Sequence, residues 1–284
     1  MSVLSSESFY WGNNDEIIYI PARYTVDSEG NAICTHTFSL EHAFDECTSV
    51  DTEGLYNAFQ MCTGITGSIS FPKLTNIDEQ GLYFAFNGCT GITSVSFPEL
   101  TSIGDSGLSN AFYECTGITG NVSFPKLTSI SYNGLSDVFR GCIGITSASF
   151  PKLTSIGNDG LSNAFYECTG ITSVSFPKLT SVGEQGLYFA FYGCTGITGS
   201  ISFPELTSID YGGLEGAFSG CTGITGSVSF PKLTSIGDSG LSDAFYYTGI
   251  TEIHFRSDAQ STVEAATGYD SKFGASNATI YFDL

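Results

Sequence analysis

The sequence is short of charge, and above all of positive charge. Only 13% of its 284 residues are charged. The chain has 9 Lys and Arg but 29 Asp and Glu residues, so its formal net charge is −20. Ordinary soluble domains carry roughly 25% charged residues. A surface of this sign repels nucleic-acid phosphates and anionic lipid headgroups. We therefore expect no nucleic-acid partner.

Catalytic and membrane signals are also missing. No apolar run approaches the roughly 18 residues that a spanning helix needs, so no membrane insertion is expected. There is no Gly-x-Ser-x-Gly, P-loop or His-Glu-x-x-His motif, and His36, His42 and His254 lie far apart in the sequence. No paired Cys-x-x-Cys predicts a metal site. The sequence thus predicts a non-enzyme without cofactor or metal. Residues 1–10 show no basic region followed by an apolar run, as a secretory signal would.

What the chain does contain is a repeat of 26 or 27 residues, with the consensus G-L-x-x-A-F-x-x-C-T-G-I-T-(G)-S-V-S-F-P-K-L-T-S-I. A shortened copy at Leu40–Cys47 and a degenerate one at Leu241–Phe255 bring the array to about nine coils, which predicts a solenoid. The cysteine of the repeat recurs at Cys62, Cys89, Cys115, Cys142, Cys168, Cys194 and Cys221.

Each copy shows two periodicities. Apolar residues at i, i+3, i+4 and i+7 predict one face of a short helix, with Asp105 or Ser106 capping its start and Gly117 its end in one copy. The next segment, Asn121–Phe124, alternates with period two and predicts a strand. The helical positions in this copy are Leu108, Ala111, Phe112 and Cys115.

The run Leu-Thr-Ser-Ile-Gly…Ala-Phe-x-x-Cys-Thr-Gly-Ile-Thr-Ser-Val-Ser-Phe-Pro resembles the BspA-like leucine-rich repeat of bacterial and protist surface proteins. It covers residues 40–255, about three quarters of the chain, and its copies are a few residues longer, with Gly-Leu before Ala-Phe. The resemblance implies an α/β repeat solenoid. This is a right-handed leucine-rich-repeat superhelix with a parallel sheet on one face and short helices on the other. It also implies an extracellular or cell-surface location.

The ends of the chain depart from the repeat, and we expect one structural domain with a cap at each end. Before the array we expect a strand, a turn and a strand; after it, a short helix and a strand. The domain boundaries are 1–39 for the N-terminal cap, 40–255 for the array and 256–284 for the C-terminal cap. The expected elements are Ile17–Tyr24, Asp27–Asn31, Ala32–Phe38, Ala259–Ala266 and Ala278–Phe282. The ending Ser276–Phe282 is also similar to C-termini of phage tail-associated proteins of gut bacteria, which implies a phage particle as the alternative location.

Several recurring residues have a structural interpretation. The cysteines lie on the apolar face, where buried thiols are expected, although thiols of adjacent coils would be near disulfide distance. Phe112, Phe124 and their equivalents are expected to stack in the core. Acidic residues before each helix are expected to cap it rather than to bind calcium; they are Asp78, Glu79, Asp105, Asp159, Glu184, Asp210 and Asp238.

Two faces are candidate binding surfaces. Small polar residues at the outward strand positions would form a regular platform for a glycan or a protein, or would simply permit tight packing. They include Ser94, Ser96, Asn121, Ser123, Ser147, Ser149, Ser173, Ser175, Ser200 and Ser202. On the other face, exposed tyrosines favour a role in recognition. The alternative is a surface without functional constraint, whose residues drifted after the repeats were duplicated. The candidates there are Tyr83, Tyr113, Arg140, Tyr166, Tyr188 and Tyr192.

The sequence as a whole therefore predicts a non-catalytic binding module. The first hypothesis is an adhesin or surface-recognition protein that engages a protein or glycan on a cell surface through an extended repeat face. The alternative is a structural or tail-associated phage protein that contacts the bacterial host.

Overall fold

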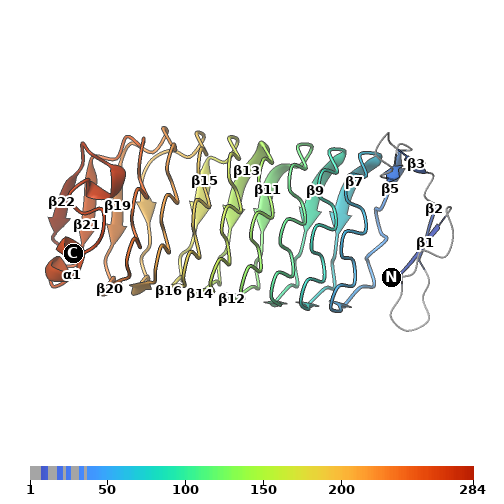
Figure 1. Cartoon of the computed structure of the whole chain (residues 1–284), viewed down its shortest axis with the longest axis horizontal. Helices are drawn as coiled ribbons and strands as arrows, with labels where there is room; N and C mark the ends of the chain where they lie inside the picture. Colours follow the sequence, from blue (N-terminus) through green and yellow to red (C-terminus); the bar gives the residue numbers. More distant parts are fainter. Residues whose placement is uncertain (1–7, 12–17, 22–23, 27–31, 35–36) are drawn as a thin grey trace.

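The structure, a computed structural model, describes residues 8–11, 18–21, 24–26, 32–34 and 37–284. From residue 37 onward the chain forms a parallel β-solenoid of about nine coils. The coils follow one another in sequence order along a nearly straight axis (Figure 1). The expected solenoid and parallel strand pairing are thus observed. Among the described residues, no helix is both long and apolar enough to cross a membrane.

Two files of parallel strands run along the solenoid. The first file alternates inward apolar and outward polar residues; its strands are β5 (Phe38–Ser39), β7 (Ile65–Ser70), β9 (Ile92–Ser96), β11 (Thr119–Ser123), β13 (Gly144–Ser149), β15 (Ser173–Ser175), β17 (Ile201–Ser202), β19 (Ser227–Phe230), β21 (Glu252–Phe255) and β22 (Thr279–Phe282). The second file holds two-residue strands from the Ser-Ile part of the repeat; these are β6 (Ser49–Val50), β8 (Asn76–Ile77), β10 (Ser102–Ile103), β12 (Ser129–Ile130), β14 (Ser155–Ile156), β16 (Ser181–Val182), β18 (Ser208–Ile209) and β20 (Ser235–Ile236). The first file consists of three parallel sheets, β5-β7-β9, β11-β13-β15 and β17-β19-β21-β22, and the second file of two, β6-β8-β10 and β12-β14-β16-β18-β20. Within each sheet a strand pairs with its equivalent in the next coil, for example Ser147 with Ser173.

The two ends carry the remaining elements. Before the array, β1 (Ser8–Trp11) pairs antiparallel with β2 (Ile18–Pro21), and β3 (Tyr24–Val26) with β4 (Ala32–Cys34). The strands expected within Ile17–Tyr24 and Ala32–Phe38 are observed as β2 and β4, but they do not pair with each other, since the partner of β2 is β1 and that of β4 is β3. The expected turn Asp27–Asn31 lies outside the described residues. After the array, the expected helix and strand are observed as α1 (Gln260–Glu264) and β22, with a 3₁₀ turn, η1, at Lys272–Gly274 between them.

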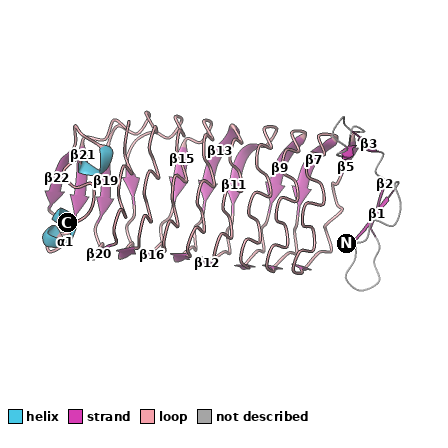
Figure 2. Ribbon diagram, viewed as in Figure 1, coloured by secondary structure: helices cyan, strands magenta, loops and turns pink. Residues whose placement is uncertain are grey.

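The expected helices of the array are not there. Figure 2 shows turns and loops where they were predicted, and helix only near the C-terminus. In each coil this side is a turn segment, in which every second backbone N–H bonds to the C=O three residues earlier, as Ala111 N–H does to Leu108 O at 3.0 Å. One residue in four has positive φ; in one coil these are Ser106, Asn110 and Glu114, at 54°, 56° and 53°.

The remaining amides of the turn segment explain why it replaces a helix. They bond to the next coil: Leu108 N–H reaches Gly134 O at 2.9 Å and Phe112 N–H reaches Val138 O at 3.0 Å. Strand pairing fixes the coil spacing at about 4.8 Å, whereas an α-helix is about 10 Å wide. A straight stack of coils at this spacing has no room for one helix per coil. The turn segment satisfies the same backbone groups within the available height.

The absence of helices also changes the roles expected for the capping residues. Gly117 does not have positive φ; a Cβ there would lie 2.3 Å from Thr90 O and 2.7 Å from Ile92 O of the preceding coil. Its equivalents recur because neighbouring backbones pass close to them. Ser106 adopts the left-handed conformation within the turn segment rather than capping a helix. The acidic residues expected to cap helices, such as Asp105, lie instead at the start of turn segments, where there is no helix dipole.

The first coil contains a second departure. Leu40–Cys47 reads like the Leu-x-x-Ala-Phe-x-x-Cys of the turn segment and does form i to i−3 turns. However, its Phe44 stacks on Phe71 at 4.5 Å, and β5 and β6 on either side pair with β7 and β8. This segment therefore lies beside the end of β7 and the Phe-Pro corner. It is not the turn segment of an additional copy in the register that the sequence predicted.

The core is filled by two ladders of phenylalanine rings, as expected. One ladder comes from the turn segments; its centroids from Phe86 to Phe112 are 5.3 Å apart. The other comes from the ends of the long strands; from Phe97 to Phe124 the spacing is 5.7 Å. The ladders also touch each other edge-on, as Phe97 and Phe112 do at 6.2 Å. All four rings are almost completely buried.

Candidate interaction surfaces

The outward side of the long strands, called the sheet face, is flat and almost uncharged. The burial pattern matches the expected facing: Val95, Val122 and Ala148 are buried, while the serines on either side of them are exposed or half-buried. The hydroxyl groups of Ser202 and Ser229, which belong to adjacent coils, lie 3.1 Å apart. The candidate residues from Ser94 to Ser202 all belong to this face, and the stretch that they form offers small hydroxyl and amide groups but no aromatic or charged side chain.

The outward side of the turn segments, called the turn face, carries the tyrosines. Arg140 lies at its centre, with its guanidinium carbon 4.4 Å from the centroid of Tyr166 and 5.8 Å from that of Tyr113. Its Nη1 donates to Asp137 Oδ1 at 3.2 Å. These groups come from three successive coils, so the structure brings together three of the candidates predicted from the sequence.

The cluster continues toward the C-terminus through further rings. Tyr166 stacks on Tyr192 at 4.6 Å, and Phe189 meets both Tyr192, at 5.6 Å, and Tyr188, at 4.5 Å. Tyr188 is thus joined to the Arg140 group. A continuous aromatic strip results, defined as Tyr113, Arg140, Tyr166, Tyr192, Phe189 and Tyr188. Each of these side chains is half-buried.

Tyr83 lies apart from this strip. It stacks on Tyr56 at 5.1 Å and meets Phe84 edge-on at 4.6 Å, nearer the N-terminal end. Three aromatic participants, Tyr56, Phe84 and Phe189, were not among the predicted candidates. The available signal was that Phe84 and Phe189 recur beside Tyr83 and Tyr188, in a position otherwise filled by Asn, Asp or Gly, and that Tyr56 is the equivalent of Tyr83 one coil earlier.

Small polar residues in the same columns are buried. Ser109 and Ser136 are only 5% and 8% exposed, and Asn87 and Ser219 are likewise buried. They occupy the same columns as the tyrosines, so the longer side chains of adjacent coils cover them. The exposed part of the turn face is therefore concentrated in the aromatic and charged residues.

Charge on the turn face is strongly negative. Arg140 is the one Lys or Arg of the described turn segments, while Glu114 and Glu167 flank the strip and are exposed. Partial burial raises the pKa of Asp159, and nearby Glu184 raises it further. The lysines of the array lie at the opposite corner, after Phe-Pro, at Lys73, Lys126, Lys152, Lys178 and Lys232.

The repeat cysteines are structural. Eight cysteines, Cys47 and the seven of the repeat, are buried. From Cys89 to Cys221 each repeat thiol donates to a phenylalanine carbonyl of the preceding coil, as Cys115 does to Phe86 O at 3.0 Å. Burial raises the pKa of Cys115 and of Cys168 to about 12, despite hydrogen bonds that lower it. These thiols stay protonated at neutral pH, so they are poor nucleophiles.

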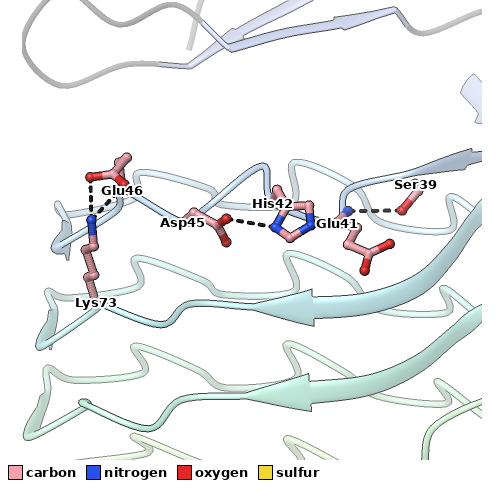
Figure 3. Close-up of polar contacts among 6 residues, drawn as sticks. All are labelled: Ser39, Glu41, His42, Asp45, Glu46 and Lys73. Atoms are coloured by element: carbon pink, nitrogen blue, oxygen red, sulfur yellow. Dashed lines mark hydrogen bonds and ion pairs between the residues drawn. The ribbon is translucent and has the colours of Figure 1, made fainter.

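Two charged groups lie at the ends of the sheet face. At the first coil a hollow of about 480 Å³ is lined partly by Glu41, Asp45 and Ser68. Figure 3 shows two ion pairs among its lining residues: His42 Nδ1 lies 2.8 Å from Asp45, and Lys73 Nζ 2.6 Å from Glu46.

At the last coil, His254 lies 2.9 Å from Asp283 and 3.3 Å from Glu252, and stacks on Tyr281. In the described part of the chain, no three His, Cys, Asp or Glu side chains are grouped to hold a metal ion.

A parallel solenoid that places one such repeat in each coil is a leucine-rich-repeat protein. Residues 55–159 and 135–269 match the family described as BspA type leucine rich repeat region, in 6 copies. The chain belongs to this family, as its sequence resemblance predicted. No curated protein matches the sequence.

Three solved structures are similar to the chain. A leucine-rich repeat protein from Bacteroides ovatus is 19% identical, with a TM-score of 0.47 over 100% of this chain and 77% of the other. The leucine rich repeat protein of T. pallidum is 16% identical, with a TM-score of 0.35 over 91% and 88%. A leucine rich cell surface protein from Faecalibacterium prausnitzii is 14% identical, with a TM-score of 0.31 over 84% and 64%.

Proposed function

We propose that this protein is a non-catalytic recognition module, which binds a protein ligand on a cell surface through the aromatic strip of its turn face. The observation that carries the proposal is the continuity of that strip from Tyr113 to Tyr188 over four coils. Tyrosine and arginine are the residues most enriched at the energetic centres of protein interfaces. Tyrosine also gives a large contact area with few rotatable bonds.

Ring geometry favours a protein over a glycan on this face. Sugars pack on the open faces of aromatic rings, but Tyr166 and Tyr192 stack on each other at an interplanar angle of 15°. The ring faces that stack on each other are therefore not open to a sugar, and Arg140 covers the other face of Tyr166. The strip therefore offers mainly ring edges and hydroxyl groups, which suit the mixed apolar and polar surface of a protein.

The sheet face supports a second candidate, a glycan platform. Its evidence is the regular double file of small polar residues from Ser94 to Ser202, one exposed or half-buried pair in each coil. Because these residues include no aromatic ring and no charge, each contact would be a single neutral hydrogen bond of about 1 kcal/mol. The turn face is therefore our first choice.

The test uses labelled full-length protein and flow cytometry. Panels of bacterial strains, of mammalian cells and of beads coated with matrix proteins are compared, each before and after protease or periodate treatment. A turn-face variant, Tyr166→Ala with Tyr192→Ala, is matched by a sheet-face variant, Ser173→Ala with Ser175→Ala. We expect that protease treatment of the cells or beads abolishes binding. We also expect that the turn-face variant loses binding and that the sheet-face variant retains it.

The other outcomes are equally informative. Loss in the sheet-face variant alone, together with periodate sensitivity, would transfer the function to the glycan platform. Binding to mammalian cells or matrix supports an adhesin, whereas binding confined to certain bacterial strains supports a phage protein that touches its host. If both variants retain binding, neither the turn face nor the sheet face is the binding surface, and both proposals are refuted.

A further inference from the structure

The sheet of the last coils ends in a strand with one open edge. This strand, β22, is the last in the order β17-β19-β21-β22, and Figure 1 shows it as the outermost strand at the C-terminal end of the stack. It pairs in parallel with β21, from Glu252 and Thr279 to Phe255 and Phe282. No other strand of the described residues lies along its opposite edge.

The backbone groups of Ile280 and Phe282 point to this open edge. In a parallel pair, the N–H and C=O of one residue face the same neighbour, and those of the next residue face away from it. Thr279 N–H donates to Thr251 O at 2.9 Å, so Thr279 and Tyr281 face β21, whereas Ile280 and Phe282 face the open side. Within the described part of the chain, no backbone group bonds to Ile280 or Phe282 on that side. Two donors and two acceptors are therefore available to a further strand.

The edge is preformed and unprotected. Natural proteins keep edge strands from pairing with lysine, proline or a bulge. In contrast, β22 reads Thr-Ile-Tyr-Phe, a run of β-branched and aromatic residues that favours strand pairing. The strand is also held in place, since Phe282 stacks on Phe255 at 6.1 Å and Tyr281 on His254 at 4.9 Å. An incoming strand would meet an edge that is already ordered.

The core also lacks cover at this strand. Ile280 and Phe282 are half-buried, whereas the residues that pair with them in β21 are fully buried. A hollow of about 300 Å³ lies beside the start of β22, lined partly by Tyr269, Ala278 and Ile280. A further strand would cover the remaining apolar surface of Ile280 and Phe282, which adds to the gain from its hydrogen bonds.

A second copy of β22 matches this edge in one antiparallel register. Two residues that lie opposite each other in a hydrogen-bonded antiparallel pair exchange both of their bonds. When Ile280 lies opposite Phe282 of the second copy, two-fold symmetry places Phe282 opposite Ile280 of that copy. All the open donors and acceptors of both strands are then used. The register also puts a β-branched side chain against an aromatic ring, which stabilises a strand pair.

The hollow agrees with this register. Beyond its Phe282, the second copy would run toward the start of β22 in the first copy, where the hollow lies. Leu284, which is 48% exposed, is two residues further along the chain. An apolar side chain of the second copy is thus available at the place where the first copy has a hollow.

We infer that β22 is a dimerisation strand, which pairs antiparallel with β22 of a second copy and joins the two end sheets across a two-fold axis. The inference goes beyond the proposed function and does not depend on it. Such a dimer carries two aromatic strips, which raises its avidity for a surface with many ligands. Each copy has a net charge of −20, so repulsion opposes the pairing and salt, which screens it, strengthens the dimer.

The first experiment is analytical ultracentrifugation of the full-length protein over a series of concentrations, at low and high NaCl. We expect a monomer–dimer equilibrium with more dimer at high salt. Ile280→Pro removes a donor of the open edge and leaves the bonds to β21 intact, so it should weaken dimerisation at least about tenfold, a loss of about 1.4 kcal/mol. Ile280→Val keeps that donor and should dimerise as the wild type does.

A cysteine cross-link tests the register without a proline. The two-fold axis puts residue 281 opposite itself in a non-hydrogen-bonded pair, with Cα atoms about 4.5 Å apart, which suits a disulfide. Tyr281→Cys should therefore form a covalent dimer on mild oxidation. Thr279→Cys is the matched control on the same side of the strand, because its two copies would lie about 14 Å apart. The wild type, oxidised in parallel, accounts for the native thiols.

Three results would overturn the inference. They are a monomer at every concentration, a folded Ile280→Pro, checked by circular dichroism, that dimerises like the wild type, and cross-linking of Thr279→Cys as fast as that of Tyr281→Cys. If the protein is a monomer but the peptide acetyl-Ala-Thr-Ile-Tyr-Phe-Asp-amide shifts the NMR signals of β22 amides, the edge serves another partner and self-pairing is refuted. Cell binding by the Tyr166 and Tyr192 variant tests the proposed function separately from all of these.

Discussion

Replacing Phe165 by Ala tests the phenylalanine ladders where they are most regular. The ring is fully buried in a middle coil and stacks on Phe139 at 5.6 Å and on Phe191 at 5.3 Å. It also meets Phe150 edge-on at 6.4 Å. Removing a buried Phe costs about 3–5 kcal/mol. We expect the upper part of this range, since three aromatic contacts are lost together and the coil spacing prevents collapse into the cavity.

The measurement is urea unfolding followed by circular dichroism and by tyrosine fluorescence. Coincident transitions would show that the coils unfold as one cooperative unit. Only then does the urea curve yield a single free energy of unfolding. The matched control is Ser173→Ala on the exposed sheet face, which should change stability by less than about 0.5 kcal/mol. A cost below about 1 kcal/mol for Phe165→Ala would contradict the stacked core, and a comparable cost for Ser173→Ala would contradict the facing of the strands.

Three further predictions follow from local geometry. Gly117→Ala should destabilise by roughly 1–3 kcal/mol, because its Cβ would lie 2.3 Å from Thr90 O; an unchanged urea midpoint would contradict the close approach of the coils. The hydrogen bond to Asp283 raises the pKa of His254, so its contribution to stability is complete below the unfolded-state pKa of about 6.5 and is lost as the pH rises through the raised value. The melting temperature should therefore fall less between pH 6 and pH 8 in His254→Gln than in the wild type, and equal falls would disprove the linkage. Finally, the eight buried thiols should react with Ellman's reagent only after unfolding, and rapid labelling of several thiols in the native protein would show that the array opens easily.

The sequence was sufficient for the solenoid, the coil length, the inward and outward residues of the long strands and the buried cysteines. Each of these follows from a pattern repeated many times, so one interpretation had to fit every copy. Sequence alone failed at the turn segments. Leu108, Ala111, Phe112 and Cys115 suit a helix, but the same spacing arises in a four-residue repeat of turns.

The distinguishing signal lies in the other positions. In this copy the positions with positive φ are Ser106, Asn110 and Glu114, which are four residues apart. Across the copies such positions are often filled by Asn or Asp, which adopt positive φ more readily than other non-glycine residues. The coil height that excludes a helix is a property of the stack, which no single copy reveals. The aromatic strip depends on the stack in the same way, since Tyr113, Arg140 and Tyr166 are 26 or 27 residues apart in sequence.

The hydrogen bonds between turn segments give the solenoid a direction. Each one runs from an N–H of one coil to a C=O of the next, from Glu53 to Glu79 near one end and from Gly220 to Tyr246 near the other. One end of the stack is therefore a donor end and the other an acceptor end. At the donor end the carbonyl of Phe273 accepts from Phe245 N–H at 3.0 Å, in the place where a further coil would supply its own. The segment after the array therefore supplies a carbonyl acceptor at the end where the array itself presents donors.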